Sequence, residues 1–171
     1  MKPEKNKMQS KVKKRYLPVS IDITDEKILI IGAGESAFSK AKILKRFDAE
    51  IEFIALDICE NIKNSEWHFT QKPYEASDLE GYLMVYSCSN NIELDQQIVE
   101  DAKKRGVLVN IHDKPDLCQC ISPAVYQYKN MTVAVASNGE DVFKSIKLRN
   151  HLREYLDANI ERILDFEKYG E

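Results

Sequence analysis

Long apolar runs are absent from this sequence of 171 residues. A transmembrane helix needs about 18 consecutive apolar residues, so we expect no membrane association. The basic N-terminus is not followed by an apolar segment, so we also expect no secretory signal and a cytoplasmic protein. Apolar residues (43%) and charged residues (31%) occur in ordinary proportions, which indicates a globular protein with a sizeable core.

Cysteine is scarce, with only Cys59, Cys88, Cys118 and Cys120. At this chain length four cysteines do not form a disulfide scaffold, and without an export signal we expect reduced thiols. Cys118 and Cys120 lie near His112, which raises the alternative of a metal site. Their spacing differs from that of Cys-x-x-Cys zinc sites and no second pair exists, so we predict no metal site. We favour the interpretation that these cysteines are small buried or half-buried side chains beside an active-site loop.

Negative charge is only slightly in excess, with a net charge of −3, but the charge is uneven. Residues 1–15 contain six lysines and one arginine against a single acid, Glu4. A basic segment can bind nucleic acid. This one has no interleaved aromatic residue before Tyr16 and no helix-turn-helix context, so we expect a solvated arm and no nucleic-acid partner. Contact with an anionic ligand or a partner subunit is the alternative.

A glycine motif follows the apolar segment 27–31 and precedes a helical period. Its glycines allow a tight turn and a close approach to a pyrophosphate, and its last alanine lets the next helix pack closely. The N-terminus of that helix favours phosphate groups. A second expected strand at 50–56 completes a βαβ unit, and this context predicts a dinucleotide site. The motif residues are Gly32, Ala33, Gly34, Glu35, Ser36 and Ala37.

Apolar runs alternate with helical periods over most of the chain, which predicts an α/β protein with a doubly wound parallel sheet. Two β segments and a long helix then follow outside this pattern, and a hairpin is expected at Lys129-Asn130. An extended, edge-strand-like segment is expected at 16–23. The expected strands are 27–31, 50–56, 67–70, 83–86, 107–111, 121–128 and 131–136, and the expected helices are 36–47, 92–105 (inward Ile92, Ile98, Val99 and Ala102, ended by Gly106) and 141–166.

The long helix has little sheet left to cover. We therefore expect it to pack on a second copy of the chain and form a homodimer. Its expected apolar stripe is Val142, Ile146, Leu152, Leu156, Ile160 and Ile163.

Ligands of open α/β sheets bind beyond the carboxyl ends of the strands. Asp57 follows the second strand and is predicted to bind the adenine ribose, which favours NAD over NADP because a carboxylate repels a 2′-phosphate. The alternative is that Asp57 caps the following turn. Ser89 and Asn90 follow the strand 83–86 and are further candidates for cofactor binding.

Asp113 follows the strand 107–111 and is our candidate general base, with a turn-forming aspartate as the alternative. His112 is an acid–base residue near neutral pH. Because neighbouring residues at a strand end point in opposite directions, we expect only one of these two side chains to face the site. Residues 137–139 precede the long helix and either bind an anion or form its N-cap.

Five segments in this order resemble the precorrin-2 dehydrogenase family, which includes the dehydrogenase–chelatase part of siroheme synthases. The resemblance extends over about residues 16–155. The segments are Tyr16-Leu17-Pro18-Val19, residues 30–41 with the glycine motif, residues 109–115 with Val-Asn-x-x-Asp-x-Pro, Ile121-Ser122-Pro123-Ala124 and residues 134–139.

This resemblance implies a Rossmann-like α/β domain and NAD-dependent oxidation of precorrin-2 to sirohydrochlorin in siroheme biosynthesis. It implies a homodimer whose C-terminal parts form the substrate site, and some members also insert Fe²⁺. The family's essential aspartate matches Asp113. We accordingly divide the chain into a basic arm (1–15), an NAD-binding domain (16–115) and a hairpin and long-helix region for dimerisation and substrate (116–171). The substrate-binding candidates are Asn110, His112, Ser137, Asn138 and Gly139.

The loop 137–142 differs from the family pattern. One glycine and a Ser-Pro helix start are missing, and Glu140 and Asp141 would repel a substrate with many carboxylates unless they face away. Two alternatives therefore stand beside the dehydrogenase. One is a non-catalytic dinucleotide-binding or sensing module that does not need Asp113. The other is a member that uses Asp113 mainly for metal delivery.

Overall fold

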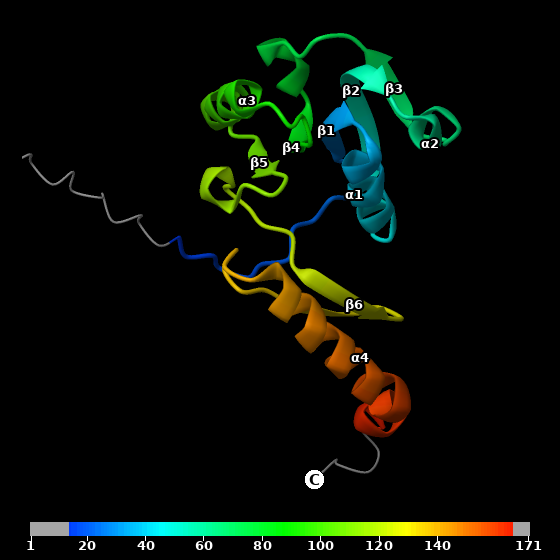
Figure 1. Cartoon of the computed structure of the whole chain (residues 1–171). Coiled ribbons are helices and arrows are strands. Elements are labelled where there is room, and N and C mark those ends of the chain that lie inside the picture. Colours follow the sequence, from blue (N-terminus) through cyan, green and yellow to red (C-terminus); the bar gives the residue numbers. More distant parts are fainter. Residues whose placement is uncertain (1–13, 166–171) are drawn as a thin grey trace, which may run out of the picture.

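The computed structural model describes residues 14–165, and its larger part is a five-stranded parallel sheet (Figure 1). The strand order β3-β2-β1-β4-β5 is the Rossmann-like arrangement, as predicted. The basic arm lies outside the described residues except for Lys14 and Arg15, and so does Phe166 at the expected end of the long helix. The strands are β1 (Lys27–Ala33), β2 (Glu50–Ile58), β3 (His68–Gln71), β4 (Tyr82–Ser87) and β5 (Leu108–Ile111).

Both faces of this sheet are covered, which is why its central strand is an unbroken apolar run. Ile28 and Ile30 point to the face covered by α1 (Glu35–Lys45) and α2 (Glu60–Lys63). Leu29 and Ile31 point to the opposite face, beneath α3 (Ile92–Arg105) and the short helix η1 (Ala76–Leu79). All four side chains are at most 2% exposed. The period-two alternation of a strand thus fills two cores at once.

A second unit follows the short helix η2 (Pro115–Leu117) and lies beside the sheet (Figure 1). It consists of the antiparallel strands β6 (Ala124–Tyr128) and β7 (Met131–Val135) and the long helix α4 (Val142–Leu164). The two-residue link between the strands confirms the predicted hairpin. Arg149 of α4 donates a hydrogen bond of 2.7 Å to the carbonyl oxygen of Val125, and Tyr126 donates one of 2.7 Å to Asp157. These contacts fix the helix against the hairpin.

Two expectations about packing are wrong. The segment 16–23 forms no strand, because the Tyr16 hydroxyl donates to the carbonyl oxygens of Pro115 and Cys118 and the chain passes over η2 instead of pairing with a sheet. Ile92 is the first residue of α3 and remains 43% exposed, beyond the part of the helix that packs. Within the apolar stripe expected on α4, Ile160 alone is buried in the single chain, and the packing of this stripe on a second copy stays a prediction.

None of the helices in residues 14–165 has the length and apolarity needed to cross a membrane.

Candidate functional site

The turn between β1 and α1 brings the backbone close to the end of β4. Gly32 has a φ of +94°, which L side chains rarely adopt, and a Cβ atom there would lie 2.6 Å from the carbonyl oxygen of Cys88. A bulge in the pairing of β1 with β2 occurs at the same point. Gly32 is therefore required by the fold itself, independently of any ligand.

Gly34 has a different role. It is the N-cap of α1, and no atom lies within 4 Å of the position that a Cβ would occupy. The first N–H groups of a helix have no partner within that helix and can bind an anion. This open space in front of a helix start fits a pyrophosphate group. The observation supports a dinucleotide at this turn.

The other residues of the glycine motif would contribute mainly backbone groups to a cofactor site. The side chains of Ala33 and Ala37 are buried in the core, where they allow α1 to lie close to the sheet. Glu35 points toward α2 and accepts hydrogen bonds of 3.0 and 3.2 Å from Asn61. Ser36 is half-buried.

Asp57 is exposed and lies in the last part of β2, which is two residues longer than expected. The N-cap of α2 is Cys59, so the alternative in which Asp57 caps this turn is not seen. Ser89 and Asn90 follow β4 after Cys88, on the other side of the glycine turn. Asp57, Ser89 and Asn90 lie along the edge of the sheet where the sequence predicts the cofactor, and their contacts with it stay a prediction.

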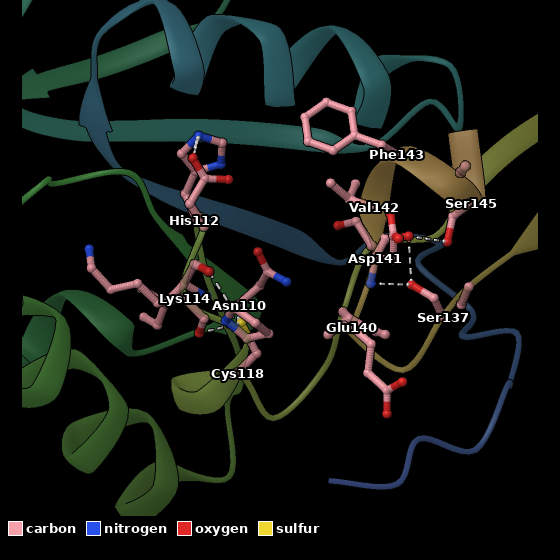
Figure 2. A pocket seen from close by; sticks show the side chains of 18 of the residues that line it. Asn110, His112, Lys114, Cys118, Ser137, Glu140, Asp141, Val142, Phe143 and Ser145 are labelled. Carbon is pink, nitrogen blue, oxygen red and sulfur yellow. Dashed lines mark hydrogen bonds and ion pairs between the residues drawn. The ribbon is translucent and has the colours of Figure 1, made fainter. Parts of the chain in front are cut away.

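A cavity of about 610 Å³ lies between the β5–η2 loop and the start of α4. Figure 2 shows His112, Lys114 and Asn110 on one side of it and Ser137, Val142 and Phe143 on the other. The structure thus brings together residues from both units. Of the predicted substrate and catalytic residues, Asn138 does not line the cavity, and those that do are Asn110, His112, Asp113, Ser137 and Gly139.

His112 and Asp113 contact each other, contrary to the expectation that only one would face the site. The Nε2 atom of His112 lies 3.3 Å from the Oδ2 atom of Asp113. The alternation of a strand ends at Ile111, and Asp113 has a φ of +57°, so its side chain turns back toward its neighbour. Both residues line the cavity, and the Asp113 side chain is 86% exposed. A carboxylate and an imidazole therefore meet at a solvent-accessible position.

The two cysteines after β5 hold the loop behind this pair. The Cys118 thiol donates to the carbonyl oxygen of Ile111 over 3.2 Å, and burial raises its pKa. Burial also raises the pKa of Cys120 to about 11. The buried Asn110 side chain donates a hydrogen bond of 2.8 Å to the carbonyl oxygen of Cys120. These contacts fix the path of the loop. Residues 14–165 contain no group of three or more His, Cys, Asp or Glu side chains placed to hold a metal ion.

The loop 137–142 forms the start of α4. The Ser137 hydroxyl accepts a hydrogen bond from the Asp141 N–H (2.9 Å) and donates to the Asp141 carbonyl oxygen (2.8 Å). The Asp141 carboxylate is the N-cap: it accepts from the Lys144 N–H and lies 3.0 Å from the Lys144 ammonium. Figure 2 shows Glu140 pointing away from Ser137 and Asp141. The N-cap of α4 is therefore Asp141 and none of residues 137–139, while Ser137 bonds the backbone of Asp141.

Two features of the site were missed at the sequence level. The first is Lys40, which stands three residues after the buried Ala37, a spacing that shares a helix face. The second is Asp95, which is 1% exposed and lies 2.6 Å from the Lys114 ammonium. It also accepts hydrogen bonds from Ser87 and Ser89. No local signal marks this pair, because α3 supplies one partner and the β5–η2 loop the other.

Comparisons with known proteins place the chain among dinucleotide-binding proteins. Residues 19–124 match a family described as "Putative NAD(P)-binding". A siroheme synthase from Vesicomyosocius okutanii is 30% identical over 129 residues, which are 73% of this chain and 28% of that protein. One from Azotobacter vinelandii is 27% identical over 152 residues, which are 86% of this chain and 33% of that protein. The chain therefore spans about a third or less of the length of these relatives.

The structure of SirC, a precorrin-2 dehydrogenase, has a TM-score of 0.66 with this one. The match covers 82% of this chain and 70% of that one at 18% sequence identity, so the two share a fold. The family match covers more than half of the chain. It includes the pyrophosphate cradle, by which we mean the turn at Gly32 and Gly34 between β1 and the N-terminus of α1. The chain belongs to this NAD(P)-binding family.

Proposed function

We propose that the protein catalyses the NAD-dependent oxidation of precorrin-2 to sirohydrochlorin, a step in siroheme biosynthesis. The observation that carries this proposal is the cavity of about 610 Å³ that is lined by Asp113 and His112. It lies at the carboxyl end of β5, in the same sheet whose central strand leads into the glycine turn. The similarity to siroheme synthases and the fold shared with a precorrin-2 dehydrogenase support the same conclusion.

NAD is the cofactor that these residues fit. The backbone at Gly32 and Gly34 and the N-terminus of α1 would hold its pyrophosphate. Asp57 would accept hydrogen bonds from the adenine ribose and would disfavour the 2′-phosphate of NADP. Ser89 and Asn90 would border the same site. When bound, NAD⁺ supplies the acceptor for the hydride that the substrate loses.

Asp113 is proposed as the base that accepts the proton released in this oxidation. The substrate loses one hydride and one proton, so the reaction needs an acceptor for each. The exposed carboxylate of Asp113 can pass its proton to solvent, and His112 at 3.3 Å can orient it. Asn110, Ser137 and Gly139, which line the cavity, are proposed to contact the substrate. Insertion of Fe²⁺ as a second substrate, with Asp113 as the base, stays a prediction.

A homodimer is proposed through α4. This helix leaves large apolar side chains in solvent, including Phe143 (80% exposed), Tyr155 (55%) and Leu148 (53%). A face of this kind is typical of an interaction surface. We accordingly assign residues 16–115 to cofactor binding and residues 116–171 to dimerisation and substrate.

The test is to incubate the protein with precorrin-2 and NAD⁺ and to record the absorption spectrum of sirohydrochlorin as it forms. We expect Asp113→Asn to bind NAD⁺ as the wild type does and to lose about 10²- to 10⁴-fold in kcat, the usual contribution of a general base. A fully active Asp113→Asn variant would remove the assignment of the base. Wild-type protein that binds NAD⁺ but forms no product would favour the non-catalytic binding module.

A further inference from the structure

Lys40 extends from the cofactor helix into the cavity that contains Asp113. It lies on α1, six residues after Gly34, and lines the cavity. Its ammonium group donates a hydrogen bond of 3.1 Å to the Ser122 hydroxyl, in the segment before β6. The same group lies 4.9 Å from the centre of the Tyr86 ring at the end of β4. Lys40 therefore stands where the two units of the molecule meet.

The contacts that hold this cation are neutral. Within residues 14–165 no carboxylate forms an ion pair with Lys40, although the Asp113 carboxylate attracts it from a distance. Lys45 on the same helix differs, since its ammonium lies 2.8 Å from Glu66. Burial lowers the pKa of Lys40, which is the mark of a charge that has lost part of its water. A half-buried cation without an anion is unfavourable, and an anionic ligand in the cavity would relieve that cost.

The position of Lys40 separates it from the pyrophosphate cradle. Six residues correspond to about 9 Å along a helix axis, and the side chain reaches toward Ser122. The nearest proposed ligand is therefore the substrate and not the cofactor phosphates. A cavity of about 610 Å³ is of the size that binds small organic ligands, and its lining includes the apolar side chains of Val142 and Phe143. A large ring with acidic side chains fits this combination.

We propose that Lys40 is a substrate-binding residue whose ammonium group binds a carboxylate of the tetrapyrrole and so selects acidic macrocycles. This inference rests on the proposed function, because the carboxylate belongs to the proposed substrate. Tyr86 and Ser122 hold the free ammonium in place for this contact. The ligand carboxylate would then supply the anion that the protein itself does not.

The experiment measures binding of sirohydrochlorin, the proposed product, by tryptophan fluorescence or absorption titration. We compare wild-type protein with Lys40→Met, Lys40→Arg and the matched control Lys42→Met, which removes an exposed lysine from the same helix. We expect Lys40→Met to bind sirohydrochlorin at least tenfold more weakly, since a hydrogen bond between charged groups is typically worth a factor of this order or more. Lys40→Arg should retain most of the affinity, and Lys42→Met should be unchanged. NAD⁺ affinity should be the same in all four proteins.

A second measurement does not depend on the folding of a variant. Acetylation of lysines in wild-type protein is followed by mass spectrometry, and sirohydrochlorin should slow modification of Lys40 severalfold while Lys42 reacts as before. The inference is overturned if Lys40→Met binds sirohydrochlorin like the wild type, or if it loses NAD⁺ affinity instead. These outcomes leave the proposed function in place. Wild-type protein that binds NAD⁺ but not sirohydrochlorin overturns both the proposed function and the role of Lys40.

Discussion

The two units of the molecule differ in how completely their elements are covered. In the sheet, β1 is covered on both faces and Leu29 and Ile30 are 0% exposed. In the second unit, no residue of β7 is buried, and Ser145 and Ile160 are the buried residues of α4. The first unit therefore has a complete core of its own. The second has one covered face, and its other face is exposed.

The function proposed for each unit follows from this difference. A dinucleotide cradle needs a rigid backbone, and Gly32 is fixed between β1 and Cys88. A large substrate needs an open surface, and the cavity opens where the half-covered unit meets the end of β5. Changes in the first unit should therefore reduce stability, whereas changes in the second should alter assembly or binding.

The largest effect is expected from Asp95→Ala. It removes the acceptor of the buried Ser87 hydroxyl and the partner of the Lys114 ammonium, whose side chain is 32% exposed, and together these losses should cost about 3–4 kcal/mol. Urea unfolding monitored by circular dichroism measures this free energy. A double variant with Lys114→Met should recover part of the loss. A loss below about 1 kcal/mol in Asp95→Ala would contradict a complete, tightly packed first unit.

Gly32→Ala should come next, at about 3 kcal/mol, because a Cβ would overlap the Cys88 carbonyl and the φ of +94° is strained. Thermal unfolding checks this. Gly34→Ala is the matched control, since no atom lies within 4 Å of its Cβ position. It should leave stability within about 1 kcal/mol of wild type and weaken NAD⁺ binding. Equal destabilisation by both changes would contradict the separate roles of the two glycines.

Leu148→Glu should affect assembly more than folding. Because this side chain is 53% exposed, the change should alter the free energy of unfolding of the isolated chain by less than about 0.5 kcal/mol. If α4 forms the dimer interface, analytical ultracentrifugation should show a dimer for wild type and a monomer for the variant. Lys147→Glu on the same helix serves as the control. A wild-type protein that is monomeric at all concentrations would rule out the dimer.

The smallest effect is expected from Asp141→Ala, and it should depend on pH. The Lys144 N–H lowers the pKa of Asp141 below its ordinary value of 3.8. A carboxyl group whose pKa is lowered by folding stabilises the protein above its ordinary pKa, and this contribution disappears as the pH falls through the folded-state pKa. Chemical unfolding of wild type and variant should therefore differ at pH 7 and converge as the pH falls below 3.8, the ordinary pKa of the carboxyl group. A difference that is constant with pH would show that the charge of Asp141 is not involved.

Much of the first unit could be predicted from local patterns. The run at 28–31, the helical period of α3 and the αL glycine at its end, Gly106, are each encoded by neighbouring residues. The hairpin at Lys129-Asn130 is likewise a local feature. The wrong predictions concern segments whose hydrophobic period does not show which other part of the chain they pack against. The extended segment 16–23 has the composition of an edge strand, but a contact of Tyr16 with the distant η2 loop decides its path.

The sequence by itself determined the parallel sheet, the glycine turn and the position of Asp113 after a strand, because backbone conformation and burial period are set by residues close together in the chain. Tertiary structure alone decided that His112 and Asp113 meet, that Asp95 pairs with Lys114 and that Lys40 enters the cavity. The first of these depends on a positive φ at Asp113, and the others join elements that the fold brings together. Such contacts follow from how loops turn and helices pack, and of these residues the sequence marks only the helix face of Lys40, three residues after Ala37.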